Sequence, residues 1–240
     1  MKTIFISDLH LDHKRPKVIN SFIEFITNSK QSMERLYILG DFVESWVGDD
    51  DPAIGTKSAF EAIRTISDRV DVFFMHGNRD FMISKKVCER YGMTLINEPT
   101  QLDLYQRNIL LMHGDTLCTD DVNYQKFRSM VRNKEWQDQM RMKPLEERLK
   151  IADQLRVQSK NATDTKKEII MDVNKEEVIN CLSKSKADIL IHGHTHRPKI
   201  HDLTIDRRKC KRIVLGDWEQ KSYILELDKN QISLTELNLS

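Results

Sequence analysis

The chain has 240 residues, of which 39% are hydrophobic and 31% are charged, and its formal net charge is +1. This composition predicts one large globular domain, or one domain with an insertion, and excludes collagen-like, disordered and disulfide-dense proteins. The near-zero net charge argues against a nucleic-acid-binding protein, because such proteins are usually strongly basic. The sequence has no leader-like N-terminus and no apolar run of about 18 residues, so we expect a cytoplasmic protein without a transmembrane helix.

Short apolar runs alternate with helical patterns along the chain. Five runs are typical of buried strands, and they cover 3–6, 36–39, 72–75, 109–112 and 189–191. Between them, apolar residues recur at helical spacing after Pro16, around Phe60 and after Asn174, which is a suitable helix N-cap. Three later runs predict antiparallel strands, the last two joined by a turn, at 213–216, 222–227 and 232–237. The whole pattern predicts an α/β layered fold with a mixed or two-sheet core.

Residues 125–160 stand apart from the rest of the chain. They hold ten Lys or Arg residues against five acidic residues, and apolar side chains lie among them at near-helical spacing. A solvated pair of surface helices would explain this pattern. A lid over an anionic, partly apolar ligand, or a helix lying on a membrane surface, would explain it as well.

Residue types that bind metals follow all five of the first predicted strands. In chain order they are Asp8 with His10, then Asp41, Asn78, His113, and His194 with His196. Because ligands bind at the carboxyl ends of strands in open α/β sheets, we expect these side chains to meet in one place. Carboxylate, imidazole and amide ligands without thiolate suit Mn, Fe, Co or Zn. If one carboxylate bridges, the seven ligands supply four bonds to each of two ions, and such a pair assists phosphoryl displacement.

The blocks D-x-H, GD, GN, H and GH-x-H occur in this order between residues 8 and 196. This order resembles that of the calcineurin-like metallophosphoesterase superfamily. The resemblance implies an α/β fold, a β-sandwich flanked by helices, with two divalent cations. The ligands that it implies are Asp8, His10 and His196 for one ion, Asn78, His113 and His194 for the other, and Asp41 as the bridge.

Longer strings such as ISDLHLD, HGNRDF and IHGHTHRP resemble a branch of this superfamily, the pyrophosphatases of the lipid A pathway, over nearly the whole chain. The resemblance implies hydrolysis of UDP-2,3-diacylglucosamine to UMP and 2,3-diacylglucosamine 1-phosphate, with Mn²⁺ as the metal. It implies a single domain over 1–240 with a helical lid at about 122–165. It also implies peripheral association with the anionic cytoplasmic face of the inner membrane, and it leaves the oligomeric state open.

The resemblance assigns roles to individual residues. Arg79 stands where many superfamily members have a histidine general acid. Because arginine does not release its proton at working pH, we interpret Arg79 as a fork that binds the diphosphate. The implied catalytic residues are Asp41, Asn78, Arg79, His113 and His194. The implied substrate contacts are Asn78, Arg79, Asp121, Ser159, Thr163, Lys166 and His194.

Two other functions fit the ligand set. One is a different phosphoesterase, such as a nucleotide or cyclic-nucleotide phosphodiesterase, and the other is a metal-bearing interaction scaffold without turnover. The complete set of ligands argues against the scaffold, and the basic amphipathic segment argues against a small-nucleotide hydrolase, which needs no such lid. Asp80 and Asp115 stand beside the ligands and are candidates for partners of metal-bound histidines or for loop anchors.

Overall fold

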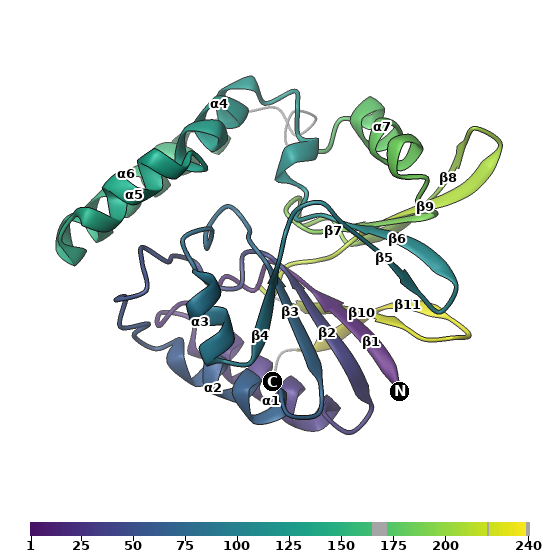
Figure 1. The fold of residues 1–240 in the computed structure, drawn as a ribbon, viewed down its shortest axis with the longest axis horizontal. Helices are drawn as coiled ribbons and strands as arrows, with labels where there is room; N and C mark the ends of the chain where they lie inside the picture. Colours follow the sequence, from purple (N-terminus) through teal and green to yellow (C-terminus); the bar gives the residue numbers. More distant parts are fainter. Residues whose placement is uncertain (165–171, 220, 239–240) are drawn as a thin grey trace.

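The computed structural model describes residues 1–164, 172–219 and 221–238, without the side chains of 158–164 and 238. Two β-sheets face one another, and helices cover their outer faces (Figure 1). The six-stranded sheet has the order β11-β10-β1-β2-β3-β4, and the five-stranded sheet has the order β5-β6-β7-β9-β8. This arrangement confirms the predicted α/β sandwich flanked by helices.

The six-stranded sheet combines parallel and antiparallel pairs. Strands β1 to β4 run parallel, whereas β10 is antiparallel to β1, and β11 to β10. Their bounds are Lys2–Ile6 for β1, Met33–Leu39 for β2, Asp71–Met75 for β3, Met93–Ile96 for β4, Lys221–Leu227 for β10 and Ile232–Asn238 for β11. The apolar pattern predicts all of these strands except β4. The parallel strands β1, β2 and β3 end at the same edge of the sheet.

The five-stranded sheet has three parallel strands, β6, β7 and β9, between two antiparallel edge strands. The bounds are Thr100–Leu104 for β5, Arg107–Leu111 for β6, Ile189–His192 for β7, Lys199–Ile205 for β8 and Arg208–Val214 for β9. The prediction of an antiparallel strand at 213–216 is wrong in its bounds, and β9 pairs in parallel with β7 as well as antiparallel with β8. The charged residues at the start of β9 hide it from a hydrophobic pattern.

Alternation along the strands divides the core into two layers. Phe5 of β1 points into the space between the sheets, where its ring stacks on Tyr37 with 5.0 Å between the centroids. Ile4 and Ile6 point to the opposite face, against the helices. Trp218 is fully buried against the aromatic rings of α1 on that side, and therefore fills the core.

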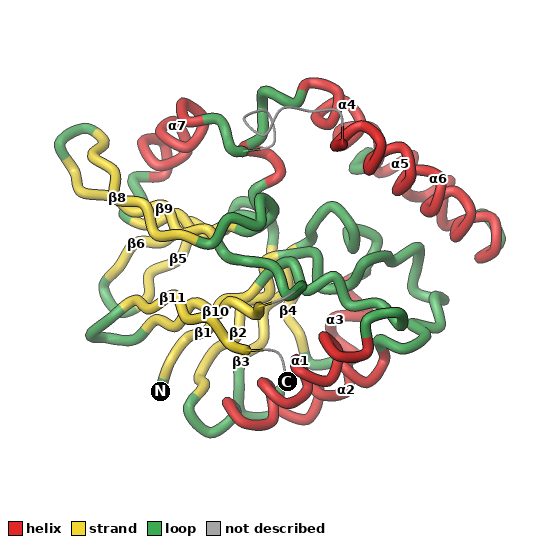
Figure 2. The backbone as a smooth tube through the Cα atoms, turned by 180° about the vertical axis from the view of Figure 1, so that it is seen from behind, coloured by secondary structure: helices red, strands yellow, loops and turns green. Residues whose placement is uncertain are grey.

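Helices pack on the outer face of each sheet (Figure 2). The first sheet carries α1 (Pro16–Ser29), α2 (Lys57–Ile66) and α3 (Lys85–Arg90), and the second carries α7 (Lys175–Ser185). Helix α1 has Pro16 at its first position, and α7 is capped by Asn174, whose side chain accepts two backbone N–H groups. These starts agree with the sequence signals.

Three helices fill the basic segment and extend away from the sandwich (Figure 1). They are α4 (Val122–Val131), α5 (Lys134–Met142) and α6 (Leu145–Asp164). The sequence pattern suggested two surface helices in this segment, and that number is wrong, because the structure has three. The Asn133 side chain accepts the backbone N–H groups of Glu135 and Trp136 and starts α5, and Pro144 precedes α6.

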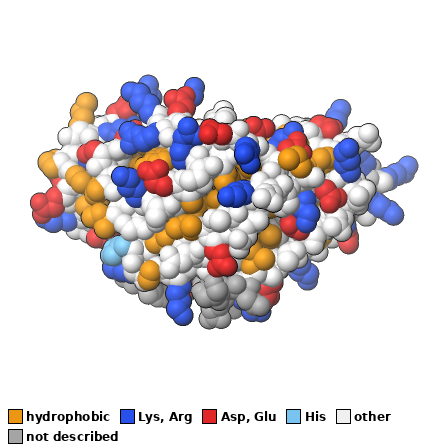
Figure 3. All heavy atoms as spheres, turned by 90° about the horizontal axis from the view of Figure 1, so that it is seen from below, with side chains coloured by type: hydrophobic (Ala, Val, Ile, Leu, Met, Phe, Trp, Pro, Cys, Tyr) orange, Lys and Arg blue, Asp and Glu red, His pale blue; other side chains and the backbone are white. Residues whose placement is uncertain are grey.

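The surface charge is mixed. The face shown in Figure 3 intersperses Lys and Arg with Asp and Glu side chains and leaves small apolar areas between them, in keeping with the net charge of +1. Among the described residues, no helix is long and apolar enough to cross a membrane.

Candidate metal centre

Loops that follow strands of both sheets carry the predicted ligands. The loops after β1, β2 and β3 belong to the six-stranded sheet, and those after β6 and β7 to the five-stranded sheet. The ligands that they carry are Asp8, His10, Asp41, Asn78, His113, His194 and His196. Both sheets therefore deliver polar side chains to one end of the sandwich.

The backbone of these loops is strained. Five of the predicted ligands have positive φ angles, at 56° for Asp8, 48° for His10, 52° for Asp41, 68° for His194 and 53° for His196. Such conformations cost about 1–3 kcal/mol each in non-glycine residues, and they cluster at functional sites. The loops also approach one another closely. A Cβ atom on Gly77 would lie 2.1 Å from Oδ1 of Asp41, so this position requires glycine.

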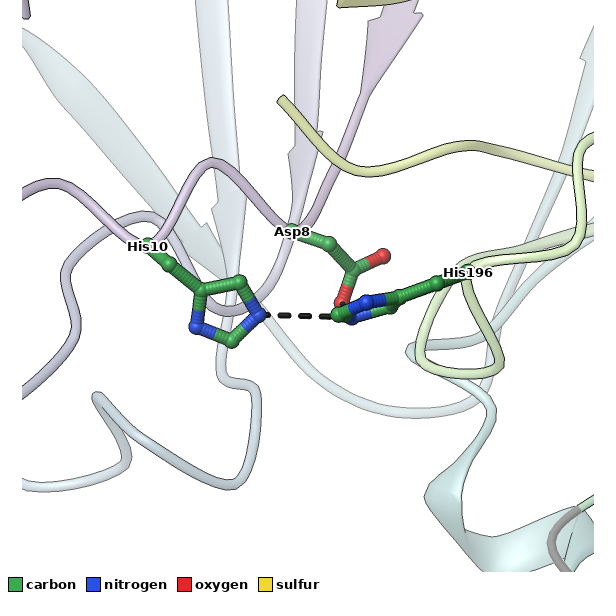
Figure 4. A group of neighbouring side chains, drawn as sticks. All are labelled: Asp8, His10 and His196. Carbon is green, nitrogen blue, oxygen red and sulfur yellow. Dashed lines mark hydrogen bonds and ion pairs between the residues drawn. The ribbon is translucent and has the colours of Figure 1, made fainter. Parts of the chain in front are cut away.

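Asp8, His10 and His196 form the first half of the centre (Figure 4). The Nε2 atoms of His10 and His196 lie 3.3 Å apart, and Nε2 of His196 lies 3.5 Å from Oδ1 of Asp8. Asp8 is fully buried, and its Oδ2 accepts hydrogen bonds from Ser7 and from the backbone of His194. Its Oδ1 has no hydrogen-bond partner among the described residues. A buried carboxylate oxygen beside two imidazoles fits a divalent cation.

Asn78, His113 and His194 form the second half. Oδ1 of Asn78 lies 3.0 Å from Nε2 of His113 and 2.9 Å from Nδ1 of His194. Asp41 lies between the halves, because its Oδ2 is 3.7 Å from Nε2 of His10 and its Oδ1 is 3.8 Å from Nε2 of His113. The structure thus brings all seven predicted ligands together, with Asp41 placed to contact both groups.

Two carboxylates that the sequence analysis did not single out contact the outer nitrogens of ligand histidines. Oε2 of Glu44 lies 2.8 Å from Nδ1 of His10, and Oδ2 of Asp217 lies 2.9 Å from Nδ1 of His196. These contacts orient each ring with Nε2 toward the centre, as is usual for metal-bound histidine. The sequence signal for these two residues is weak. Glu44 follows the Gly40-Asp41 block by three residues, and Asp217 belongs to the last of four Gly-Asp pairs in the chain.

Asp80 and Asp115 act as anchors of the loops. The Asp80 carboxylate accepts the backbone N–H groups of Phe42 and Gly77, both at 2.7 Å, and so holds two ligand loops together. Burial and the charge of Asp41 raise the pKa of Asp80 to about 7. Oδ2 of Asp115 accepts hydrogen bonds from Tyr124 and Arg128 of α4 rather than from a ligand histidine.

Hydrogen bonds connect helix α4 to the loops that carry the candidate ligands. Nε of Arg128 donates to Oδ2 of Asp115 at 2.7 Å, and its Nη2 donates to Oε2 of Glu98 at 2.9 Å. Oε1 of Glu98 in turn accepts the backbone N–H of His113 at 2.8 Å. Arg132 donates to the Gly77 carbonyl at 2.7 Å. Although α4 supplies none of the predicted ligands, it belongs to the frame that holds them.

The ligand histidines differ in pKa. Burial and the nearby His113 lower the pKa of His194 to about 4. Burial disfavours the proton of His113, but Asp41 and Asp115 raise the pKa of His113 to about 9. Burial likewise opposes the proton of His196, yet the nearby carboxylates of Asp217 and Asp8 raise the pKa of His196 to about 10. Because a metal binds neutral imidazole, a cation held by these histidines would displace their protons.

A cleft that is open to solvent joins the centre to helices α4–α6. Polar residues at its inner end include Glu44, Asn78 and Arg79, and most of the remaining wall is apolar. The full lining is Glu44, Ser45, Trp46, Val47, Asn78, Arg79, Phe81, Met82, Tyr124, Phe127, Trp136, Met140, Ala152, Leu155 and Arg156. A ligand with an anionic head and an apolar tail fits such a cleft.

Of the other predicted substrate contacts, one lines the cleft, one caps a helix, and three lie outside the described residues. Arg79 lines the cleft, with Nη1 3.9 Å from Oε1 of Glu44, and its buried Nε has no hydrogen-bond partner among the described residues. Asp121 caps α4 by accepting the backbone N–H of Tyr124 at 3.1 Å. Three predictions fall outside the described residues: the side chains of Ser159 and Thr163, and all of Lys166.

Comparisons with known proteins agree with this fold. Residues 1–198 match the model of the calcineurin-like phosphoesterase family. A Marinobacter nauticus protein named UDP-2,3-diacylglucosamine hydrolase is 47% identical over 232 residues, which are 96% of this chain and 95% of that protein. Proteins with the same name from Cellvibrio japonicus and Escherichia coli O7:K1 are 44% and 41% identical over 235 residues, or 98% of each chain. A solved archaeal phosphodiesterase, 14% identical, has the same fold, with a TM-score of 0.52 and full coverage of both chains.

Proposed function

The chain belongs to the calcineurin-like phosphoesterase family and is a metal-dependent hydrolase, and from this premise we propose that it cleaves UDP-2,3-diacylglucosamine. Hydrolysis of the pyrophosphate bond yields UMP and 2,3-diacylglucosamine 1-phosphate, a step of lipid A synthesis. One observation carries this proposal: the apolar cleft opens directly onto Asn78 and Arg79 beside the ligand cluster. A phosphodiesterase for small nucleotides would have no use for the apolar wall. The names of the close relatives support the same substrate.

Two divalent cations, Mn²⁺ in this proposal, complete the centre. The donor set of imidazole, carboxylate and amide groups suits such an ion, and the free Oδ1 of Asp8 supports one. The residues that would hold the cations are Asp8, His10 and His196 for one, Asn78, His113 and His194 for the other, and Asp41 for both. When bound, the cations lower the pKa of a water molecule and neutralise charge on the phosphoryl group that is transferred.

The side chains of this chain position the substrate. The Arg79 guanidinium offers two parallel N–H donors to phosphate oxygens, and it keeps its charge at every working pH. It therefore stabilises negative charge and does not transfer protons. Glu44 and Asp217 keep the rings of His10 and His196 in a fixed orientation. The proposed contacts to the sugar and phosphates are Asp121, Ser159, Thr163 and Lys166.

Helices α4–α6 act in this proposal as the lid of a single domain and cover the acyl chains. Trp136, Met140 and Leu155 line the cleft, and each buried methylene of a chain contributes about 0.8 kcal/mol. Met142, which is 86% exposed, lies on the outside among basic residues. Apolar and cationic side chains together suit an anionic membrane surface, and they support peripheral association with the cytoplasmic face of the inner membrane.

A turnover assay compares UDP-2,3-diacylglucosamine with UDP-sugars that lack acyl chains. We expect UMP release from the acylated substrate only, loss of turnover on exhaustive chelation, and recovery with Mn²⁺. Equal turnover of both substrate classes would refute the acyl specificity, and undiminished turnover after chelation would refute the metal mechanism.

Flotation with lipid vesicles tests the membrane surface. We expect binding to vesicles rich in anionic phospholipid, weaker binding at high salt because exposed charges are screened, and no binding to neutral vesicles. Equal binding to anionic and neutral vesicles would contradict the electrostatic attraction.

A further inference from the structure

One buried arginine fastens the turn between α5 and α6 to the body of the protein. Arg148 lies in the first turn of α6 and is 2% exposed. Its Nε donates to the carbonyl of Lys143 at 3.0 Å, and its Nη1 donates to the carbonyl of Val47 at 2.8 Å. Its Nη2 donates to the carboxylate of Asp50. We call these bonds to Val47 and Asp50 the clasp.

The loop that receives the clasp is itself held in place. Asp49 accepts hydrogen bonds from the Oγ of Ser84 at 2.5 Å and from its backbone N–H at 3.3 Å, at the start of α3. Oδ1 of Asp51 accepts the backbone N–H of Ala53 at 2.9 Å. The three consecutive acidic residues therefore have different contacts. Asp49 and Asp51 bind groups that hold the loop in place, whereas Asp50 binds Arg148 of α6.

Gly48 is part of the same arrangement. Its φ angle is +151°, and a Cβ atom there would lie 2.1 Å from Nη1 of Arg148. A side chain at this position would displace the guanidinium from the Val47 carbonyl. The clasp thus depends on Arg148 in α6 and on Gly48 and Asp50 in the loop after β2.

The clasp lies beside the walls of the cleft. Trp46 and Val47 line the cleft from the loop after β2, whereas Met140 and Leu155 line it from α5 and α6. Arg148 bonds to the carbonyl of a wall residue and belongs to a helix that carries residues of the other wall. Its bonds therefore link the two walls to one another.

We propose that Arg148 is a positioning residue that sets the width of the apolar cleft and, through it, the length of the alkyl chain that is bound. This inference rests on the proposed function for its biological meaning, since the chains in question are acyl chains of the substrate. Arg148 does not line the cleft and contacts none of the predicted metal ligands, so it acts through the position of α5 and α6.

Calorimetric binding of decyl and dodecyl phosphate to the Mn²⁺-loaded protein tests the proposal, with both probes below their micellar concentrations. In the unmodified protein we expect dodecyl phosphate to bind about tenfold more tightly, since the cleft covers two more methylenes. We call the affinity for dodecyl phosphate divided by that for decyl phosphate the chain-length ratio. In Arg148→Gln and Gly48→Ala the chain-length ratio should fall below about threefold. Arg148→Lys should keep part of this preference, because a single ammonium group can bond to one of the two acceptors but lacks the fork that reaches both. Lys150→Gln removes an exposed cation from the same helix and should leave the ratio unchanged.

Each outcome decides the matter. An unchanged chain-length ratio in Arg148→Gln and Gly48→Ala would overturn the inference, because a residue that only stabilises the fold has no effect on that ratio. If Arg148→Gln does not fold, Asp50→Asn weakens the same clasp from a side chain that is 63% exposed, and an unaltered ratio there would overturn it equally. Failure of the unmodified protein to cleave UDP-2,3-diacylglucosamine would refute the proposed function alone, because the alkyl phosphates report on the cleft.

Discussion

Replacement of Arg128 by methionine tests how firmly α4 is bound into the metal centre. The change keeps the apolar stem and removes the guanidinium that pairs with Asp115 and Glu98, whose side chains are 0% and 9% exposed. Loss of one partner from a buried ion pair costs about 3–5 kcal/mol, because the remaining charges stay buried without compensation. For a chain of this length, we expect the melting temperature to fall by about 6–20 °C.

The assay is thermal and urea unfolding of the metal-free protein at neutral pH. Arg64→Met is the matched control, because its ion pair with Asp68 is exposed and should contribute less than about 0.5 kcal/mol. Metal titration provides a second readout. Glu98 holds the backbone of His113, and loss of such a support lowers metal affinity by about 10–100-fold. A cost for Arg128→Met no larger than that of the control would refute the assignment of α4 to the frame.

Other substitutions test the centre and the clasp. Asp41→Ala should abolish turnover in a folded protein, whereas Ser159→Ala should cost only about 1 kcal/mol, the value of the single substrate hydrogen bond proposed for it; the opposite order would exclude a bridging Asp41. Arg79→Lys should lower kcat/KM by about tenfold or more, because a fork becomes a point charge, and unaltered kinetics would make Arg79 a loop anchor only. The hydrogen bond from α6 lowers the pKa of Asp50, so its stabilising effect is complete above about pH 4 and is lost as the pH falls further. Protection of the α5 amides from hydrogen exchange should weaken over that range, and Asp50→Asn should remove this pH dependence.

The convergence of the seven candidate side chains could be predicted because their residue types are few and their positions follow from strand ends. Asp41 and His113 come from different sheets, yet each follows an apolar strand, and strands of both sheets end on the same side. The carboxylate partners could not be predicted in the same way. Acidic residues are common, and the pairing of Asp217 with His196 depends on how two loops meet in space.

The strands that escaped prediction share a position in the fold. β4, β5 and β8 all lie at sheet edges, where a strand has a neighbour on one side only. Less of such a strand is buried, so polar residues interrupt its apolar pattern, as in the sequence of β8, KIHDLTI. The fourth edge strand, β11, was predicted because a turn joins it to β10 and makes the pair visible as a hairpin.

The sequence pattern of the insertion predicted the segment as a whole but not its division into parts. Its charge and amphipathic spacing distinguish 125–160 as one segment, but the structure divides it at Asn133. Helix α4, on one side, is bonded to the loops of the candidate metal centre through Arg128 and Arg132. Helices α5 and α6, on the other side, line the cleft and are fastened to the loop after β2 by Arg148. The two parts remain coupled, because Tyr124 and Phe127 of α4 also line the cleft, and Arg156 of α6 lies 3.4 Å from Glu44, which contacts His10. A change on either side of the α5 cap therefore reaches both the cleft and the candidate metal centre.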